Sequence, residues 1–485
     1  MTSRELPDTL NPIWEWELLR EPIEFIPTDS GDLPPAIEKV HVFRDESDYG
    51  LRFEATGTRT LGSVLPEERD HSGTSPFLPP AASINGQSDR WRMSVRIDNP
   101  TVDKRSWNSR GGVNLGGMAF GRLSDGRAVP GLELVALEDR EPAVSRSLWL
   151  AGSRRLTRGW SMWPRGTERE ASRIIRRVRD GGTATREITG KPGRTSLDCA
   201  FFGLDRLGSV VVASVPKEVH PDWFEGIELE YQLSTDRNNT PTPDERALAE
   251  AIGFVLGAPL VPLGRTDFDS NGRVASAAAW YPHQAELMRV TCNVHPNPPC
   301  RLSNPDHRQD TEQVLQAIVP AWLKHRDGLQ LDTVSYLLHH ASVLPIDIRL
   351  VLYMAVVQTL AQSVLTSDDT ECPQSWRRQV EGLASRYGLE IGAPEWQALR
   401  ARHEFAHAWS KPHRSLAWHA HVEAAFRTLV HRVLLASLGY KGEYIDYSDR
   451  SEPESGKPNY VGHPTRPLAE PARGRDGDGK PAPDE

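Results

Sequence analysis

The sequence predicts an α+β protein with two folded domains, a β-rich N-terminal domain followed by an all-α helical bundle. Three observations support this. The 485 residues exceed what one hydrophobic core usually holds. Short β-like runs separated by turn clusters fill residues 1–240, and long helical periodicity replaces them from Thr311 onward. Hydrophobic residues make up 38% of the chain and charged residues 25%, as in an ordinary globular protein.

The N-terminal domain, residues 1–305, is expected to be mostly sheet. The segment KVHVFRDESDYGLRFEATG reads as two strands around a polar turn, and RWRMSVRID, GLELVALED, SLWLAGS and GIELEYQLS repeat the pattern. A helix is expected over 246–256, because acidic residues precede it. Two more strands, around Pro262 and over 274–280, complete this domain before the proline-rich connector HPNPPCRLSNPDH.

The second domain, residues 311–447, is predicted to be a helical bundle. DIRLVLYMAVVQTLAQSVL is apolar on most of its circumference, as expected of a central helix. WHAHVEAAFRTLVHRVLLASLG carries one apolar stripe, and Gly439 is expected to end that helix. Residues 448–485 are rich in Pro, Gly and charge and almost without aliphatic side chains, so they are predicted to form a disordered tail.

Composition also bears on the class of protein. The formal net charge of −9 argues against a protein that permanently coats nucleic acid, but not against a nuclease with a local positive site. Residues 311–445 hold 13 Lys+Arg and 13 Asp+Glu, so the charge deficit lies elsewhere. The N-terminus lacks the apolar core of a signal peptide, and the four cysteines are too few for a disulfide scaffold. We therefore expect a cytoplasmic protein with no membrane association.

The stretch RHEFAH, Arg402 to His407, is compatible with two different chemistries. Taken from His403 it is H-E-x-x-H, the signature of zinc proteases; taken from Arg402 it is R-x4-H, which suits metal-free cleavage of RNA. Extended zinc-protease motifs require a glycine where this chain has Ser410 and a methionine turn downstream, yet all six methionines lie at or before Met354. A zinc metalloprotease that uses HEFAH, with Glu423 as the nearest third ligand, is the weaker alternative. We expect no metal and no other cofactor.

The helix that carries the motif places His403 and His407 on one face with Trp396 and Leu399. Arg402 and His407 are separated by ~7.5 Å of rise and ~140° of rotation. An arginine side chain closes that gap only in part, so a second copy of the helix is expected to complete the site. The residue types suit RNA cleavage, because histidine titrates near neutrality and a guanidinium binds phosphate oxygens with a permanent charge.

The order of elements in this region resembles the ApeA-like HEPN domain, a branch of the HEPN ribonucleases of prokaryotic defence and toxin systems. A helical pair comes first, a helix with R-x4-H follows, and a last amphipathic helix ends in LGYKGEYIDYS. The resemblance covers residues 311–447. The region before it, with ALAEAIGFVLGAPLVPLGRTDFDSNGR, is similar to the N-terminal domain that accompanies this HEPN type. Three positions depart from the family pattern: His403 where Asn is common, Ala408 where Gly is common, and Gln358 where an acidic residue is frequent.

The resemblance implies a metal-independent endoribonuclease that leaves 2′,3′-cyclic phosphate ends and acts in anti-phage defence by abortive infection. Arg402 and His407 would carry the reaction, with His403 as a third catalytic residue. The charge near the motif suggests that RNA is bound by Arg400, Lys411 and Arg414. The expected partners are RNA, such as tRNA or another host or phage RNA, and a second copy of the chain in a homodimer or higher oligomer. The N-terminal domain would sense a phage-derived trigger or restrain the enzyme. The alternative is a non-catalytic HEPN module that binds a nucleotide or a partner.

Overall fold

The computed structural model divides into two compact units, and each is described by itself. The first comprises Met1–Ala151, Gly166–Thr242 and Val261–Leu287; the second comprises Gly152–Arg165, Pro243–Leu260 and Met288–Glu485. Within these units the structure describes residues 3–5, 22–29, 36–45, 50–58, 83–89, 92–98, 100–107, 112–119, 122–124, 127–129, 131–137, 142–152, 173–177, 183–187, 199–204, 208–214, 226–233, 245–269, 274–281, 297–302, 308–366, 372–407, 415–449 and 463–473. For some of them, including residues 402–407, the description covers only the backbone.

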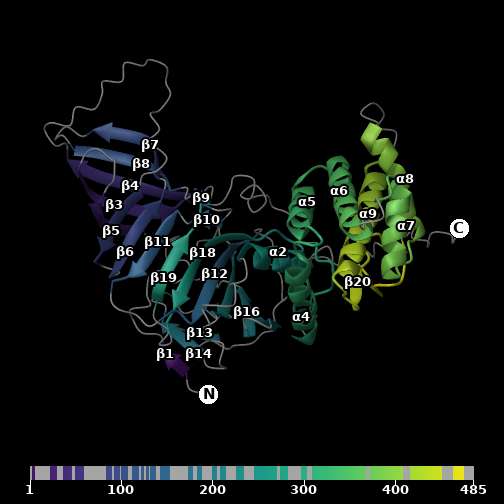
Figure 1. The fold of residues 1–485 in the computed structure, drawn as a ribbon, viewed down its shortest axis with the longest axis horizontal. Helices are drawn as coiled ribbons and strands as arrows, with labels where there is room; N and C mark the ends of the chain where they lie inside the picture. Colours follow the sequence, from purple (N-terminus) through teal and green to yellow (C-terminus); the bar gives the residue numbers. More distant parts are fainter. Residues whose placement is uncertain are drawn as a thin grey trace, which may run out of the picture. The chain divides into compact units, whose positions relative to one another are not determined.

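The first unit is built on one large sheet whose described pairings are all antiparallel. Its 14 strands follow the order β15-β16-β17-β12-β18-β19-β11-β6-β5-β2-β3-β4-β8-β7 (Figure 1). The strands are β2 (Ile23–Asp29), β3 (Ala36–Arg44), β4 (Leu51–Thr58), β5 (Ser83–Ser88), β6 (Met93–Asp98), β7 (Pro100–Trp107), β8 (Gly112–Ala119), β11 (Leu132–Ala136), β12 (Ser145–Ala151), β15 (Cys199–Leu204), β16 (Gly208–Ser214), β17 (Gly226–Gln232), β18 (Val261–Phe268) and β19 (Val274–Ala279). Two small sheets accompany it, β1 (Ser3–Glu5) with β14 (Thr183–Glu187) and β13 (Arg173–Arg177), and β9 (Arg122–Ser124) with β10 (Arg127–Val129).

Alternation and close packing explain why these segments form strands. In β6 every second side chain, from Met93 through Val95 to Ile97, is buried, which is the period of a strand with one face on the core. The central strand β12 is buried along almost its whole length, and Trp149 lies over Gly264 of β18. A β-carbon at Gly264 would lie 3.0 Å from the Trp149 ring, so the glycine makes room for the indole.

The second unit is helical. Its helices are α2 (Glu245–Leu256), α4 (Arg308–His325), α5 (Leu331–Val343), α6 (Ile346–Leu365), α7 (Trp376–Tyr387), α8 (Ala393–His407) and α9 (Leu416–Ser437). Figure 1 shows α6, α7, α8 and α9 side by side, with α9 packed against the other three. The buried stripe of α9 contains Val422, Phe426, Leu429, Val430 and Val433, and Gly439 follows it with a positive φ of 73°. That stripe and that stop match the sequence prediction.

Helix α2 corrects the predicted boundary between the domains. The sequence places it in the N-terminal domain, residues 1–305, but it packs in the helical unit. The ring of Phe254 lies 5.1 Å from that of Trp322 on α4, and Arg326 Nε lies 2.9 Å from a carboxylate oxygen of Glu250. The chain leaves α2 through Gly257, whose φ of +68° and close contact with Asn297 leave no space for a side chain. Position in the sequence did not reveal which core the apolar face of α2 joins.

The predicted disordered tail, residues 448–485, is wrong for residues 463–473. These residues fold onto the helical unit, where β21 (Thr465–Pro467) pairs antiparallel with β20 (Glu443–Ile445). Leu468 and Ala472 are buried there. Composition predicts disorder because this segment has few aliphatic residues to bury; polar pairing with an existing surface holds it instead.

The α+β class is confirmed in its coarse form, a β-rich N-terminal region followed by helices. Among the described residues, one segment, Ile348–Leu365 of α6, is long and apolar enough to cross a membrane by length and composition. It packs against α5, α7, α8 and α9, as predicted for the central helix of a bundle.

Candidate functional site

Helix α8 carries the R-x4-H motif at its C-terminal end. It begins at Ala393 and ends at His407. A carboxylate oxygen of Glu395 accepts a hydrogen bond from the backbone N–H of Gly392 at 2.8 Å, which satisfies a free donor at the helix start. The buried side of the helix includes Glu395, Ala398 and Ala401. Small residues on this side allow α8 to pack closely against α9.

An ion pair with no solvent exposure joins the start of α8 to α9. Arg432 Nη1 on α9 lies 2.7 and 2.8 Å from the two carboxylate oxygens of Glu395, and both side chains are 0% exposed. The other terminal nitrogen of Arg432 donates to the carbonyl oxygens of Glu390 at 2.8 Å and Leu468 at 3.3 Å. Complete burial raises the pKa of Glu395, and the charge of Arg432 opposes that rise. One guanidinium therefore ties α8, α9 and the C-terminal segment together.

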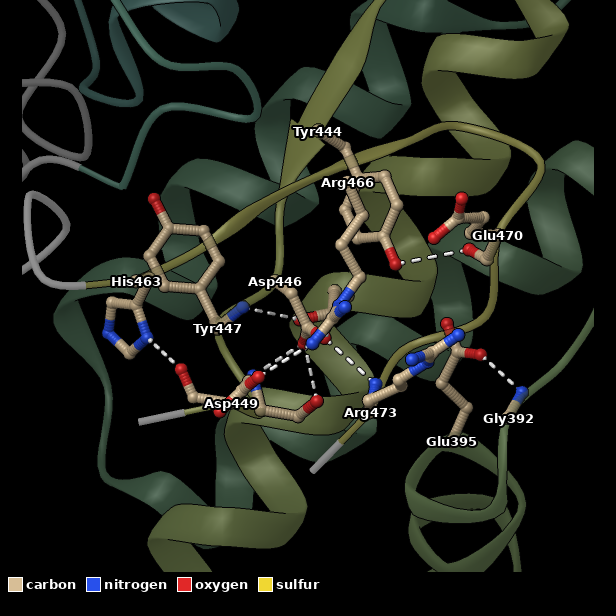
Figure 2. Close-up of polar contacts among 12 residues, drawn as sticks. Gly392, Glu395, Tyr444, Asp446, Tyr447, Asp449, His463, Arg466, Glu470 and Arg473 are labelled. Carbon is tan, nitrogen blue, oxygen red and sulfur yellow. Dashed lines mark hydrogen bonds and ion pairs between the residues drawn. The ribbon is translucent and has the colours of Figure 1, made fainter. Parts of the chain in front are cut away.

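A second polar cluster, drawn in Figure 2, holds the C-terminal segment in place. Asp446 is fully buried and accepts hydrogen bonds from Arg466 Nε at 2.8 Å and from the backbone N–H of Arg473 at 2.9 Å. Arg466 reaches Asp449 at 2.6 Å, and the Tyr444 hydroxyl donates to the carbonyl oxygen of Glu470 at 3.1 Å. We call this end of the helical unit, with the Glu395–Arg432 pair and residues 463–473, the closed end.

The Glu395–Arg432 contact also fixes the alignment of α8 with α9. Glu395 lies near the start of α8 and Arg432 near the end of α9, so the two helices are antiparallel. Arg402 follows Glu395 by seven residues, ~10.5 Å of rise and ~20° short of two full turns, so its backbone lies on the same side of α8. Seven residues back from Arg432 is Ala425, which is fully buried. The backbone of Arg402 is therefore level with Ala425, on the side of α8 that faces α9.

His407 occupies a different side of α8. It follows Glu395 by twelve residues, which is ~18 Å of rise and ~120° past three full turns. That is close to the angular position of Trp396, and it fits the ~140° separation from Arg402 that the sequence predicts. The predicted spacing of the motif thus places Arg402 on the inner side of α8 and His407 on a flank. The side chains of Arg402, His403 and His407 lie outside the described residues.

A buried polar network lies on α6 and α9 at the level of Arg402. Glu423 of α9 accepts hydrogen bonds from Arg427 Nε at 3.1 Å and from the Tyr353 hydroxyl of α6 at 3.2 Å, and Arg349 Nη1 lies 3.9 Å away. Arg427 also donates to Asn297 and lies 4.8 Å from the centre of the Tyr447 ring. Burial alone would lower the pKa of Arg427, but Glu423 raises it above its usual value. Burial and the charge of Glu423 raise the pKa of Tyr353. Arg427 and the Tyr353 phenol are thus held in their protonated forms.

This network corrects two details of the sequence analysis. Glu423, the nearest third ligand in the zinc-protease hypothesis, is bound by two arginines and a tyrosine, which compete with a metal for its oxygens. Gln358, which stands where the family often has an acidic residue, is exposed on α6. The buried carboxylate that faces α6 comes instead from Glu423 of α9. The i,i+4 spacing of Glu423 and Arg427 was the sequence signal for it.

The other predicted site residues differ in their exposure and in whether the structure describes them. Arg400 is exposed on α8, as an RNA-binding residue requires, whereas Lys411 and Arg414 lie outside the described residues. Trp396, part of the face predicted to bind a second copy, is half-buried with Arg377 of α7 5.7 Å from its ring centre. Part of the predicted dimer face is therefore used within the chain.

No group of three or more His, Cys, Asp or Glu residues that would suit a metal occurs in the described part of the chain; the side chains of His403 and His407 are not included in that statement. Comparison of the chain with protein-family models, with curated proteins and with solved structures finds no match. The HEPN resemblance therefore rests on the motif, its order among the helices and the residues around it.

Proposed function

We propose that this protein is a metal-independent endoribonuclease of the HEPN type, with Arg402 and His407 at its centre. The observation that favours it most is the setting of the motif. A buried ion pair locks the R-x4-H helix against α9, and the carboxylate of Glu423, the nearest third ligand in the zinc-protease hypothesis, is bound by arginines and a tyrosine. A carboxylate held in this way is a poor ligand for zinc, which favours the metal-free chemistry of the motif.

The reaction needs three contributions. A base removes the proton of the RNA 2′-hydroxyl, a cation stabilises the extra negative charge on the phosphorane, and an acid protonates the departing 5′-oxygen. We assign the base to His407 and the cation to Arg402, with His403 as a neighbour that orients the phosphate. Arg400 extends the positive surface on the exposed side of α8. In this proposal the enzyme is cytoplasmic, acts as a homodimer in abortive infection, and is restrained or triggered through its β-rich unit.

The direct test is cleavage of total RNA by the full chain, followed by analysis of the new ends. We expect cleavage to persist in EDTA, because no step requires a Lewis acid, and the upstream products to end in 2′,3′-cyclic phosphates, because the nucleophile belongs to the RNA. Activity that disappears in EDTA and returns with zinc would favour the metalloprotease-type site and would overturn this proposal.

The competing function is a HEPN module that binds a nucleotide or a partner without cleaving RNA. It predicts that the full chain binds RNA or nucleotides with no new ends formed. A filter-binding assay on the same preparation separates the two functions, since an enzyme shows both binding and cleavage. Host RNA and infected-cell RNA must both be assayed, because a phage-derived trigger would leave the resting protein silent.

A further inference from the structure

We propose that exposed arginines of α7 form an RNA-binding surface that continues onto α8 and leads toward the R-x4-H motif. The surface consists of Arg377, Arg378 and Arg386 of α7 with Trp396 and Arg400 of α8, and we call it the arginine tract. Its partner is single-stranded RNA. The inference rests on the proposed ribonuclease function and deepens it, because it names the surface that holds the substrate outside the reacting motif.

Helix α7 has a buried apolar side and an exposed side rich in arginine. Val380 and Leu383 are 1% and 0% exposed, so the apolar side is packed within the helical unit. The arginines of α7 are all exposed to solvent. Eight residues separate Arg378 from Arg386, which gives ~12 Å of rise and ~80° of rotation. Two guanidinium groups at this spacing reach different phosphates of one extended strand.

Most of the positive charge on this side of α7 is available to an anion. The helix carries three arginines and one glutamate, although the whole chain has a net charge of −9. The glutamate is Glu381, whose carboxylate lies 2.7 Å from Arg377 Nε; the two side chains are 44% and 78% exposed. An ion pair this exposed is worth little, so a phosphate readily takes its place. Within the part of the chain that the structure describes, Arg378, Arg386 and Arg400 have no ion-pair partner.

An aromatic ring lies among these cations. The Arg377 guanidinium is 5.7 Å from the centre of the Trp396 ring, and the tryptophan is only half-buried. RNA bases stack on aromatic side chains and on guanidinium planes, so this pair offers both kinds of surface. Arg400 follows Trp396 by four residues and therefore lies one turn further along the same side of α8. The tract thus runs from the start of α7 onto α8, in the direction of the motif.

The composition of the tract favours RNA over other anionic partners. A helix that binds a membrane surface exposes apolar side chains beside its cations. None of the fully exposed residues of α7, a helix that the structure describes throughout, is apolar. An acidic segment of a protein would pair with the arginines and leave the ring of Trp396 unused. A nucleic-acid strand uses both, through its phosphates and its bases.

The test measures binding of the full chain to a single-stranded RNA of about 12 nucleotides by fluorescence anisotropy. The RNA is 2′-O-methylated, so it lacks the nucleophile and is bound without being cut. The double variant Arg378→Gln with Arg386→Gln should bind at least ~10-fold more weakly at low salt, because two phosphate contacts are lost. Its slope of log K against log salt should become shallower by ~1.4, or ~0.7 for each lost contact. The KM for cleavable RNA should rise in the same variant.

The matched control is Lys324→Gln with Lys441→Gln, which removes the same charge from exposed positions elsewhere in the helical unit. Its affinity should stay within about threefold of the natural chain, because neither lysine belongs to the tract and salt screens exposed charges. Trp396→Leu should weaken binding at least ~5-fold with an unchanged salt slope, since it removes a stacking surface and no charge. Thermal melts accompany each variant, and the exposed α7 substitutions keep the test valid should Trp396→Leu unfold.

Several results would overturn the inference. They are natural affinity in the α7 double variant, equal losses in the two double variants, and a natural chain that binds phosphatidylserine vesicles or polyglutamate in preference to RNA. Failure of the proposed function looks different. In that case the natural chain would leave cleavable RNA intact, while the α7 double variant still lost affinity for the methylated strand.

Discussion

The two ends of the α8–α9 pair use arginine and glutamate in opposite ways. At the closed end, Arg432 and Glu395 have no exposed surface, and backbone carbonyls accept hydrogen bonds from Nη2 of Arg432. At the motif end, Glu423 is buried, but Arg349 remains 28% exposed, and His419 and His421 of α9 are half-buried. One end is sealed by the C-terminal segment, and the other remains open to solvent.

The difference in exposure separates a structural contact, which fixes how two helices pack, from a site that must react with a substrate. A fully buried ion pair costs several kcal/mol to desolvate, so it is a poor source of net stability but a strong constraint on which residues meet. Here it sets the alignment of α8 on α9, and that alignment decides what faces the R-x4-H motif ~10–18 Å away. A site that handles protons on RNA needs the reverse, because its groups must titrate and admit a substrate.

The largest effect is expected from breaking the closed end. Arg432→Met leaves the Glu395 carboxylate buried without a cation, so the free energy of unfolding should drop by about 3–5 kcal/mol in urea denaturation. The control is Arg377→Ala, which removes an i,i+4 partner of Glu381 where the side chains are 78% and 44% exposed, and also the contact with the Trp396 ring. That change should cost less than about 1.5 kcal/mol. Equal losses in the two variants would contradict the distinction between the ends.

The second-largest effect is expected from substitution of the R-x4-H residues. Arg402→Ala and His407→Ala should each lower the rate of RNA cleavage at least ~100-fold, or about 2.7 kcal/mol of transition-state stabilisation. Their melting temperatures should fall less than that of Arg432→Met. Arg400→Ala, two residues away on the exposed side of α8, should raise KM with little change in kcat. A His407→Ala variant that cleaves normally would remove His407 from the mechanism.

A smaller effect should appear as a dependence of stability on pH. Burial, with the nearby charge of Arg427, lowers the pKa of His431 from 6.5 to about 3. The folded protein keeps this histidine neutral while the unfolded chain protonates it, so stability is complete above pH 6.5 and is lost as pH falls toward 3. Between pH 7 and 5 the loss from this group should be about 2 kcal/mol. His431→Phe, between the rings of Phe254 and Tyr447, should flatten the dependence of unfolding free energy on pH in that interval. The same slope in both proteins would show that His431 is not responsible.

The smallest effect concerns the C-terminal segment. Arg466→Ala removes the donors that reach Asp446 and Asp449 and should cost about 1–2 kcal/mol, since Arg466 is 15% exposed and Asp446 keeps other donors. Faster proteolysis near residues 463–473 should accompany that loss. Arg301→Ala, which removes one exposed bond to the carbonyl oxygen of His463, is the milder comparison. Unchanged stability and proteolysis in Arg466→Ala would mean that the cluster at Asp446 does not hold the segment.

The sequence by itself determined the kinds of elements and the spacing inside them. Alternating residues identified β6, a short β-like run identified β12, the apolar stripe and Gly439 identified α9 and its end, and helical geometry gave the separation of Arg402 from His407. These properties depend on neighbours a few residues apart, where backbone geometry gives a definite answer.

Only the tertiary structure decided which elements share a core and which polar groups meet. It placed α2 with the helices, ordered residues 463–473, and paired Glu395 with Arg432 across 37 positions. The physical reason is that a buried charge or an apolar face requires a partner. The sequence offers several partners that satisfy this requirement and does not distinguish between them. Packing selects one of them, and with it the surroundings of the site.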